Sequence, residues 1–360
     1  MSMLDPSIDE HKRRHGNIRV KFISRVETRT WLRQFPDRNP VWDQCEFVFD
    51  IEARNYDWVV VYDDMPPQHQ ERFSTRQEQL ACPQKNTLLV TGEPSSIKTY
   101  GDAFTHQFGH VLTSHFDWAL PHPGRIWSQP ALQWFYGIGS QEEIPYDALH
   151  DTAPWEKPRT LSAVCSSKQQ KHTLHNRRYE FTMQLKDLLP DMELYGHGVR
   201  DMDDKAEALH DYRYHVAIEN HRGPHHWTEK LADPFLALSL PFYYGCTNAS
   251  DYFPEESFIE LDINDAEESA RIISTSIDNN EYEKRLPAII EARRRVLEEY
   301  NLFAVLGREI GNLNRTPSQG DSGSILRSRR AANRASPVAG LKYFYQKGRN
   351  RLLHQVRSSL

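Results

Sequence analysis

Residues 214–245 read YHVAIENHRGPHHWTEKLADPFLALSLPFYYG. Residues 214–218 are typical of a buried strand that ends in the polar pair Glu219-Asn220. A helix follows with Thr228 as its N-cap and with apolar residues at helical spacing, and residues 241–245 predict a second strand. The free N–H groups and dipole of the helix start, together with the Lys230 ammonium, favour a phosphate. The stretch therefore predicts a β-loop-α-β unit that binds a nucleotide.

Short strands alternate with helical segments along the chain, which predicts the α/β class with parallel sheets. We expect an N-terminal α/β domain over residues 1–150. An acidic, proline-interrupted linker runs from about residue 139 to 159. Residues 158–312 are predicted to form a second α/β domain, which contains the nucleotide unit. Residues 313–360 are predicted to be a basic flexible tail that ends in a short amphipathic helix.

The composition is that of a soluble globular protein, with 38% hydrophobic and 26% charged residues among 360. No apolar run is long enough to span a bilayer, and residues 1–14 are polar rather than signal-like. The four cysteines are far apart in the sequence, which indicates reduced, buried thiols. We expect a cytoplasmic protein, peripheral at the inner membrane if the tail binds it.

Charge is unevenly distributed along the chain. Residues 315–360 carry a net charge of +9, and because the whole chain carries −6, residues 1–314 carry −15. An acidic body repels nucleic-acid backbones, so we expect no nucleic acid among the partners.

Four segments resemble, in order and spacing, the α-1,3/4-fucosyltransferases of glycosyltransferase family 10. They are IENH at 218–221, WTEKL at 227–231, SLPFYYG at 239–245 and PEESFI at 254–259. The resemblance implies a GT-B-like fold, in which two Rossmann-type domains face each other across a cleft. Residues 1–150 would form the acceptor-side domain and residues 158–312 the nucleotide-sugar donor-binding domain. It also implies an inverting enzyme that moves L-fucose from GDP-fucose to a glycan hydroxyl, with no tightly bound cofactor and no metal.

The resemblance has departures that concern the donor pocket. Ser239 stands where the family has glycine, Pro234 lies in the helix interior, and residues 242–244 are bulkier than the family's valines. The donor sugar can therefore differ from fucose. A surface polysaccharide, with transfer α-1,3 to N-acetylglucosamine, is the expected acceptor.

Transfer from a nucleotide sugar requires cations for the departing diphosphate. Lys230 and Arg178 are the candidates for this role, and Arg177 is a third. The family's phosphate-binding arginine has the placement of Arg178, seven residues before a helical leucine, here Leu185. The alternative is that all three are solvated helix residues.

Three polar residues complete the predicted donor site. The resemblance implies that Glu229 accepts hydrogen bonds from the ribose hydroxyls, although a glutamate in a first helical turn is favoured by the dipole alone. Asn220 is expected to bind the donor sugar or phosphate, and Glu219 either contacts the donor or orients the loop.

Glu93 is the candidate general base, because the family has a similar Thr-Gly-Glu at the corresponding strand end. Partial burial would raise its pKa towards neutrality, which suits a base. The alternative is a surface turn glutamate.

Two other patterns are discounted. Residues 201–204 (DMDD) resemble the metal motif of GT-A enzymes, but we interpret them as a solvated loop or helix start. The spacing of His221, His225 and His226 fits no zinc site, although His221 can touch the donor phosphate.

The basic tail has two interpretations: a solubilising segment, or a helix over residues 340–360 that binds an anionic membrane surface. For the chain as a whole, the alternatives to a fucosyltransferase are a GT-B enzyme with another nucleotide sugar and a non-catalytic nucleotide- or glycan-binding module.

Overall fold

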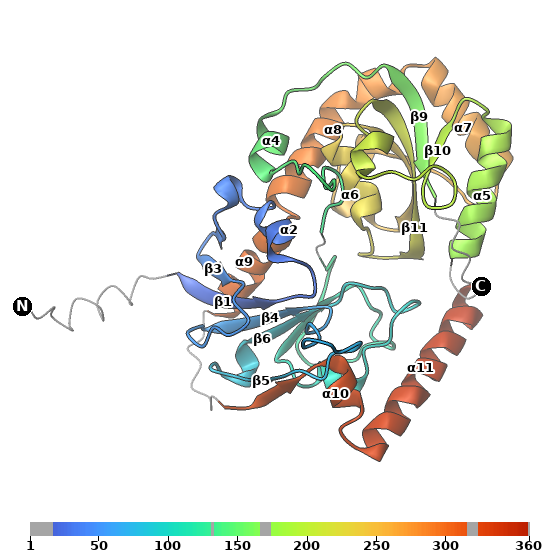
Figure 1. Ribbon diagram of the computed structural model, residues 1–360. Coiled ribbons are helices and arrows are strands. Elements are labelled where there is room, and N and C mark those ends of the chain that lie inside the picture. The colour runs from blue at the N-terminus through green and yellow to red at the C-terminus, as the bar shows by residue number, and fades with distance from the viewer. Residues whose placement is uncertain (1–16, 131–132, 166–173, 315–322, 359–360) are drawn as a thin grey trace, which may run out of the picture.

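The structure is a computed structural model that describes residues 17–130, 133–165, 174–314 and 323–358. In these ranges the chain folds into two α/β domains, one above the other in Figure 1. Their sheets are almost entirely parallel, as the alternation of strands and helices predicts.

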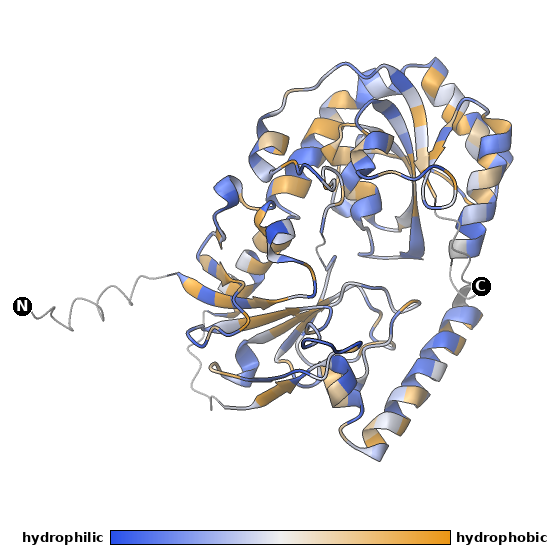
Figure 2. Ribbon diagram, viewed as in Figure 1, coloured by the Kyte–Doolittle hydropathy of each residue, from blue (hydrophilic) through white to orange (hydrophobic). Residues whose placement is uncertain are grey.

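The N-terminal sheet has, within the described ranges, seven strands in the order β2-β3-β1-β4-β6-β7-β8, and only the β2–β3 pair is antiparallel. The strands are β1 (Ile18–Ile23), β2 (Val41–Trp42), β3 (Cys45–Val48), β4 (Trp58–Tyr62), β6 (Thr87–Val90), β7 (His110–Thr113) and β8 (Arg125–Trp127). Side chains of β4 alternate between the two faces: Trp58 and Val60 join one core, and Val59 and Val61 the other. Figure 2 shows the resulting apolar strands in the lower domain.

The C-terminal sheet is wholly parallel in the order β10-β9-β11-β12-β13. Its strands are β9 (Arg159–Val164), β10 (Glu193–Tyr195), β11 (Tyr212–Gly223), β12 (Leu240–Cys246) and β13 (Ile259–Glu260). Four helices cover it: α5 (His175–Leu188), α6 (Glu229–Leu236), α7 (Ala266–Asp278) and α8 (Glu281–Glu298). Two parallel α/β domains with a shared cleft are the GT-B arrangement that the sequence predicts.

The domain boundary needs a correction. Helix α9 (Leu302–Leu313), which the sequence assigns to the donor domain, packs its apolar side on the N-terminal sheet. The Phe303 ring, for example, stacks on the Phe35 ring with ring centroids 4.0 Å apart. The chain therefore returns to the first domain near residue 301. The sequence does not predict this packing, because the apolar face of a helix does not indicate which sheet the helix packs on.

The described part of the predicted flexible tail is also built into the N-terminal domain. Strand β14 (Ile325–Arg327) pairs antiparallel with β5 (Gln77–Gln79), and Leu326 is buried. Helix α10 (Arg329–Asn333) packs on α3 (Asp102–Thr105), and the long α11 (Pro337–Ser358) follows. Residues 315–322 of the predicted tail lie outside the described residues.

Helix α11 runs along the edge of the molecule to the junction of the two domains (Figure 1). His354 hydrogen-bonds Ser95 at 3.0 Å, and its ring contacts that of His221 on β11. Within the described residues, no helix combines the length and the apolarity that crossing a membrane requires. The other α-helices of the described ranges are α2 (Thr28–Leu32) and α4 (Tyr146–Asp151).

Candidate active site

A cavity of about 390 Å³ lies between the two domains at the carboxyl ends of their parallel strands. The N-terminal domain contributes the ends of β1, β4 and β6, and the C-terminal domain contributes the end of β11 and the start of α6. The lining residues are Ser24, Arg25, Val26, Tyr62, Asp63, Gly92, Glu93, Pro94, Ile97, Gln133, Phe135, Glu219, Asn220, His226, Thr228, Glu229 and Lys230. Five of the seven predicted site residues thus line one cavity.

The loop before α6 is fixed by a buried carboxylate. Glu219 is fully buried and accepts hydrogen bonds from the Thr228 backbone N–H (2.7 Å) and hydroxyl (2.7 and 2.9 Å). Thr228 in turn caps the helix, because its Oγ1 accepts from the Lys230 backbone N–H at 3.2 Å. The predicted cap is confirmed, and in this structure Glu219 orients the loop.

Lys230 lies between two carboxylates on the cavity wall. Its Nζ is 2.8 Å from Glu229 Oε1 and 3.8 Å from Glu219 Oε2. Burial alone would lower the pKa of Lys230, but these carboxylates raise it, so the ammonium stays charged. Burial raises the pKa of Glu219, whereas the Lys230 and Lys205 charges outweigh burial at Glu229 and lower its pKa. Lys230 therefore carries a positive charge that two carboxylates hold at the cavity wall, and it is not an exposed helix lysine.

Arg178 reaches the same end of the sheet from α5. It is buried, its Nη1 donates to Asn220 Oδ1 at 2.7 Å, and its charge lowers the pKa of Lys230. Its Nε has no hydrogen-bond partner, and within the described residues it forms no ion pair with a carboxylate. A buried guanidinium with an unused donor can bind an anion. Arg177, the third candidate, is exposed and does not line the cavity.

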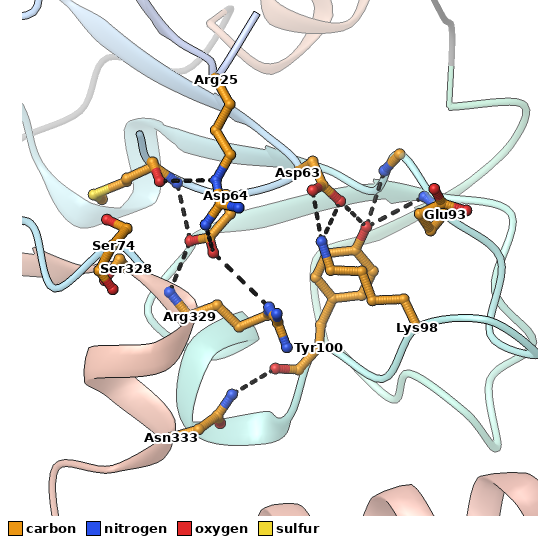
Figure 3. A network of polar contacts seen from close by, with 12 residues as sticks. Arg25, Asp63, Asp64, Ser74, Glu93, Lys98, Tyr100, Ser328, Arg329 and Asn333 are labelled. Atoms are coloured by element: carbon orange, nitrogen blue, oxygen red, sulfur yellow. Dashed lines mark hydrogen bonds and ion pairs between the residues drawn. The ribbon is translucent and has the colours of Figure 1, made fainter. Parts of the chain in front are cut away.

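Glu93 lies across the cavity, at the end of β6 (Figure 3). The backbone N–H groups of Gly92 and Glu93 donate to the Tyr100 hydroxyl at 3.0 and 3.3 Å. That hydroxyl donates to Asp63 Oδ1 at 2.6 Å, and the Lys98 ammonium donates to both Asp63 oxygens at 2.6 Å. The loop that carries Glu93 is thus held by a connected polar network.

The surroundings of Glu93 suit a general base. Burial in the cleft raises the pKa of Glu93, and the nearby Asp63 carboxylate raises it further, while Lys98 and Lys230 oppose the shift. A carboxylate with a raised pKa accepts a proton more readily. The arrangement places this carboxylate and the Lys230 ammonium on the wall of one cavity.

Asp63, Lys98 and Tyr100 were missed by sequence reasoning. Asp63 follows directly after a buried strand and has a positive φ of 66°, which asparagine and aspartate tolerate better than most residues. Its position at a strand end was a usable signal. Lys98 and Tyr100 lie in a loop with no pattern that points to the cavity.

The discounted patterns have structural roles. Asp204 caps a short 3-10 helix (Lys205–Ala208), so the predicted loop or helix start is confirmed. The His221 and His226 rings hydrogen-bond Ser96 and Ser114, and burial lowers the pKa of both, to about 3 for His221. Among the residues that the structure describes, no group of histidine, cysteine or acidic side chains is arranged to hold a metal ion.

Comparison with known proteins relates part of the chain to a family. Residues 155–284, which include α5, β11 and α6, match the sequence model of glycosyltransferase family 10 (fucosyltransferase) C-term. No curated protein matches the chain significantly.

Solved structures give matches over most of the chain. An alpha1,3-fucosyltransferase crystallised with GDP-fucose is 12% identical, with 89% of this chain and 95% of that chain covered and a TM-score of 0.48. A glycosyltransferase from Rickettsia africae ESF-5 is 9% identical, with 84% and 100% covered and a TM-score of 0.41.

Two facing parallel domains with a cavity between them are the GT-B arrangement. The family match covers residues 155–284, the domain that supplies Arg178, Asn220 and Lys230 to this site. The resemblance found in the sequence is confirmed for this domain.

Proposed function

We propose that this protein transfers L-fucose from GDP-fucose to a glycan hydroxyl with inversion at the anomeric carbon. The observation that carries the proposal is one cavity lined by Lys230 and Asn220 on the donor side and by Glu93 on the other, with Arg178 hydrogen-bonded to Asn220. The family match of the donor domain and the GDP-fucose named for a solved fucosyltransferase support this donor. The acceptor we favour is N-acetylglucosamine of a surface polysaccharide, fucosylated at O3.

Each side of the cavity has a defined task in this reaction. Glu93 accepts the proton of the acceptor hydroxyl while the hydroxyl oxygen attacks the anomeric carbon. The bond to the GDP oxygen breaks, and the growing negative charge on the diphosphate is stabilised by Lys230, Arg178 and the N–H groups at the start of α6. Glu229, on the donor side of the cavity, would accept hydrogen bonds from the ribose hydroxyls. The protein needs no tightly bound cofactor in this scheme.

Nucleotide selectivity tests the proposal directly. In a thermal-shift experiment, GDP at 100 times its Kd should stabilise the protein by about 2.7 kcal/mol, more than UDP or CDP at equal concentration. Equal shifts with all three would contradict a GDP-sugar donor and favour another nucleotide sugar. GDP binding without turnover of GDP-fucose would favour the non-catalytic alternative.

We further propose that α11 binds an anionic membrane surface from the cytoplasmic side. Six large apolar side chains on this helix are between 59% and 72% exposed: Val338, Leu341, Phe344, Tyr345, Leu352 and Val356. Exposed Lys342, Lys347 and Arg351 accompany them on the same helix. An apolar stripe with basic neighbours is typical of helices that lie in a membrane interface.

Co-sedimentation with vesicles tests whether α11 binds an anionic membrane surface. Wild type should pellet with vesicles that contain phosphatidylserine but not with neutral vesicles, and Leu341→Glu with Phe344→Glu should abolish pelleting. Because both side chains are exposed, these changes should leave the thermal unfolding temperature unaltered. Equal recovery of wild type and variant in the supernatant would contradict the proposal.

A further inference from the structure

The segment that joins the two domains passes the cavity and is fixed by a buried arginine. Arg33, on the N-terminal domain and fully buried, donates to the carbonyl oxygens of Trp134, Tyr136, Gly137 and Ile144 at 2.6–3.2 Å. Burial lowers the pKa of Arg33 to about 10, so the guanidinium is still charged at neutral pH. A buried charge bound to four carbonyls fixes the backbone it gathers.

The C-terminal domain holds the same segment from the other side. Asp233, on α6, accepts from the Phe135 backbone N–H at 3.1 Å and from Lys205 Nζ at 2.7 Å. Asp204 accepts from the Gly137 backbone N–H at 3.0 Å. Residues 134–137 are therefore clamped between both domains by buried or partly buried charges.

Side chains alternate along this clamped segment. Trp134 and Tyr136 are 2% and 1% exposed, whereas Phe135 between them is 45% exposed and lines the cavity. The cavity that the ring lines has many polar residues on its wall, among them Glu93, Asn220 and Lys230. A rigidly held aromatic ring that faces a polar cavity is suited to a ligand with an apolar face.

We propose that Phe135 packs against the apolar face of the donor sugar and so selects which sugar is transferred. The proposal rests on the proposed function. Asp233, which holds Phe135, lies one helical turn beyond Glu229, so the ring is fixed next to the donor side of the cavity. When Lys230 binds the diphosphate of the donor, the sugar attached to that diphosphate would lie between Lys230 and Glu93.

This placement favours a 6-deoxyhexose. The methyl group of fucose packs on a phenyl ring without loss, whereas the hydroxymethyl group of L-galactose, which otherwise has the configuration of L-fucose, would bring a hydroxyl that the ring cannot hydrogen-bond. Discrimination by an apolar surface against an added hydroxyl is modest, about a hundredfold at most.

Calorimetric titration of the full chain tests the assignment with GDP, GDP-fucose and GDP-L-galactose. Phe135→Ala should raise the Kd for GDP-fucose about tenfold and reduce the preference over GDP-L-galactose, with the Kd for GDP unchanged. Phe135→Tyr, which keeps the ring, should bind as wild type does. Phe73→Ala is the matched control, because Phe73 is 46% exposed and does not line the cavity.

The outcomes separate the two levels of inference. An unchanged Kd for GDP-fucose in Phe135→Ala, or an equal loss of GDP and GDP-fucose affinity, would overturn the role of Phe135 and leave the proposed function standing. Wild type that binds neither GDP nor GDP-fucose would overturn the proposed function itself.

Discussion

The two sides of the cavity are assembled in different ways. On the donor side, Glu219, Thr228, Glu229 and Lys230 come from one strand-loop-helix unit, so their contacts are local in sequence. On the opposite side, Tyr100 holds the loop that carries Glu93 from within the same loop, but Tyr100 is itself held by Asp63, 37 positions away at the end of another strand. The donor side is thus a sequence motif, whereas the side with the proposed base depends also on tertiary packing.

The C-terminal tail also supports the side of the cavity that carries Glu93. Asp64 Oδ1, next to Asp63, accepts from the backbone N–H of Arg329, and Asn333 donates to the Tyr100 carbonyl at 2.8 Å (Figure 3). Residues more than 230 positions away therefore support the loop of Glu93. A mutation on the donor side should act on nucleotide binding, and one on the Glu93 side should act on turnover.

Glu93→Gln is the strongest test of this division. Removal of the base should lower kcat about 10²–10⁴-fold while GDP affinity stays unchanged, because the amide keeps the shape but cannot accept the proton. Steady-state transfer or hydrolysis of GDP-fucose, together with calorimetry for GDP, measures both. Unaltered kcat would show that Glu93 is not the base.

Lys230→Ala probes the donor side. Loss of a charge-assisted contact worth about 1.5–3 kcal/mol should weaken GDP binding roughly 10- to 100-fold. The variant also leaves Glu219 and Glu229 without their cation, so thermal unfolding must be measured with it. Lys230→Arg should retain part of the affinity, and Lys284→Ala on the surface of α8 should retain all of it. GDP affinity equal to wild type in a folded Lys230→Ala would contradict the role.

Tyr100→Phe tests the support of the Glu93 loop. Loss of the hydroxyl removes the acceptor of the Gly92 and Glu93 N–H groups, so kcat should fall about tenfold with the GDP Kd unchanged. Stability should fall by about 1–3 kcal/mol.

Tyr56→Phe is the matched control for this variant, because that hydroxyl accepts from the Ala81 N–H away from the cavity. It should lose stability without losing kcat. Equal effects on kcat in the two variants would reduce Tyr100 to a stability role.

Asp63→Asn should give the smallest effect, a shift in the pH profile. The Asp63 carboxylate raises the pKa of Glu93, and its removal also frees the Lys98 charge, which lowers that pKa. A base is lost as pH falls through its pKa, so the acidic limb of kcat/KM should move to lower pH in the variant. A limb that moves to higher pH, or does not move, would contradict the electrostatic role of Asp63.

Much of the fold was predictable from the sequence, since periodicity reports whether a segment is a strand or a helix. The parallel α/β class and strands such as β11 and β12 follow from short apolar runs between helical patterns. The sequence places residues 302–313 in the wrong domain. It also wrongly predicts a flexible tail, because the pairing of the tail with β5 depends on contacts across more than 240 residues.

The sequence by itself determined the strand-loop-helix unit of the proposed donor side, because residues 214–231 form one local unit whose cap, dipole and lysine act together wherever the unit is placed. Only the tertiary structure decided the rest. It brought Arg178 to Asn220, Asp63 to Tyr100 in the loop of Glu93, and Phe135 to the cavity wall. The physical reason is that these positions depend on how two sheets, a linker and a returning tail pack, and packing between distant segments leaves no periodic trace in the chain.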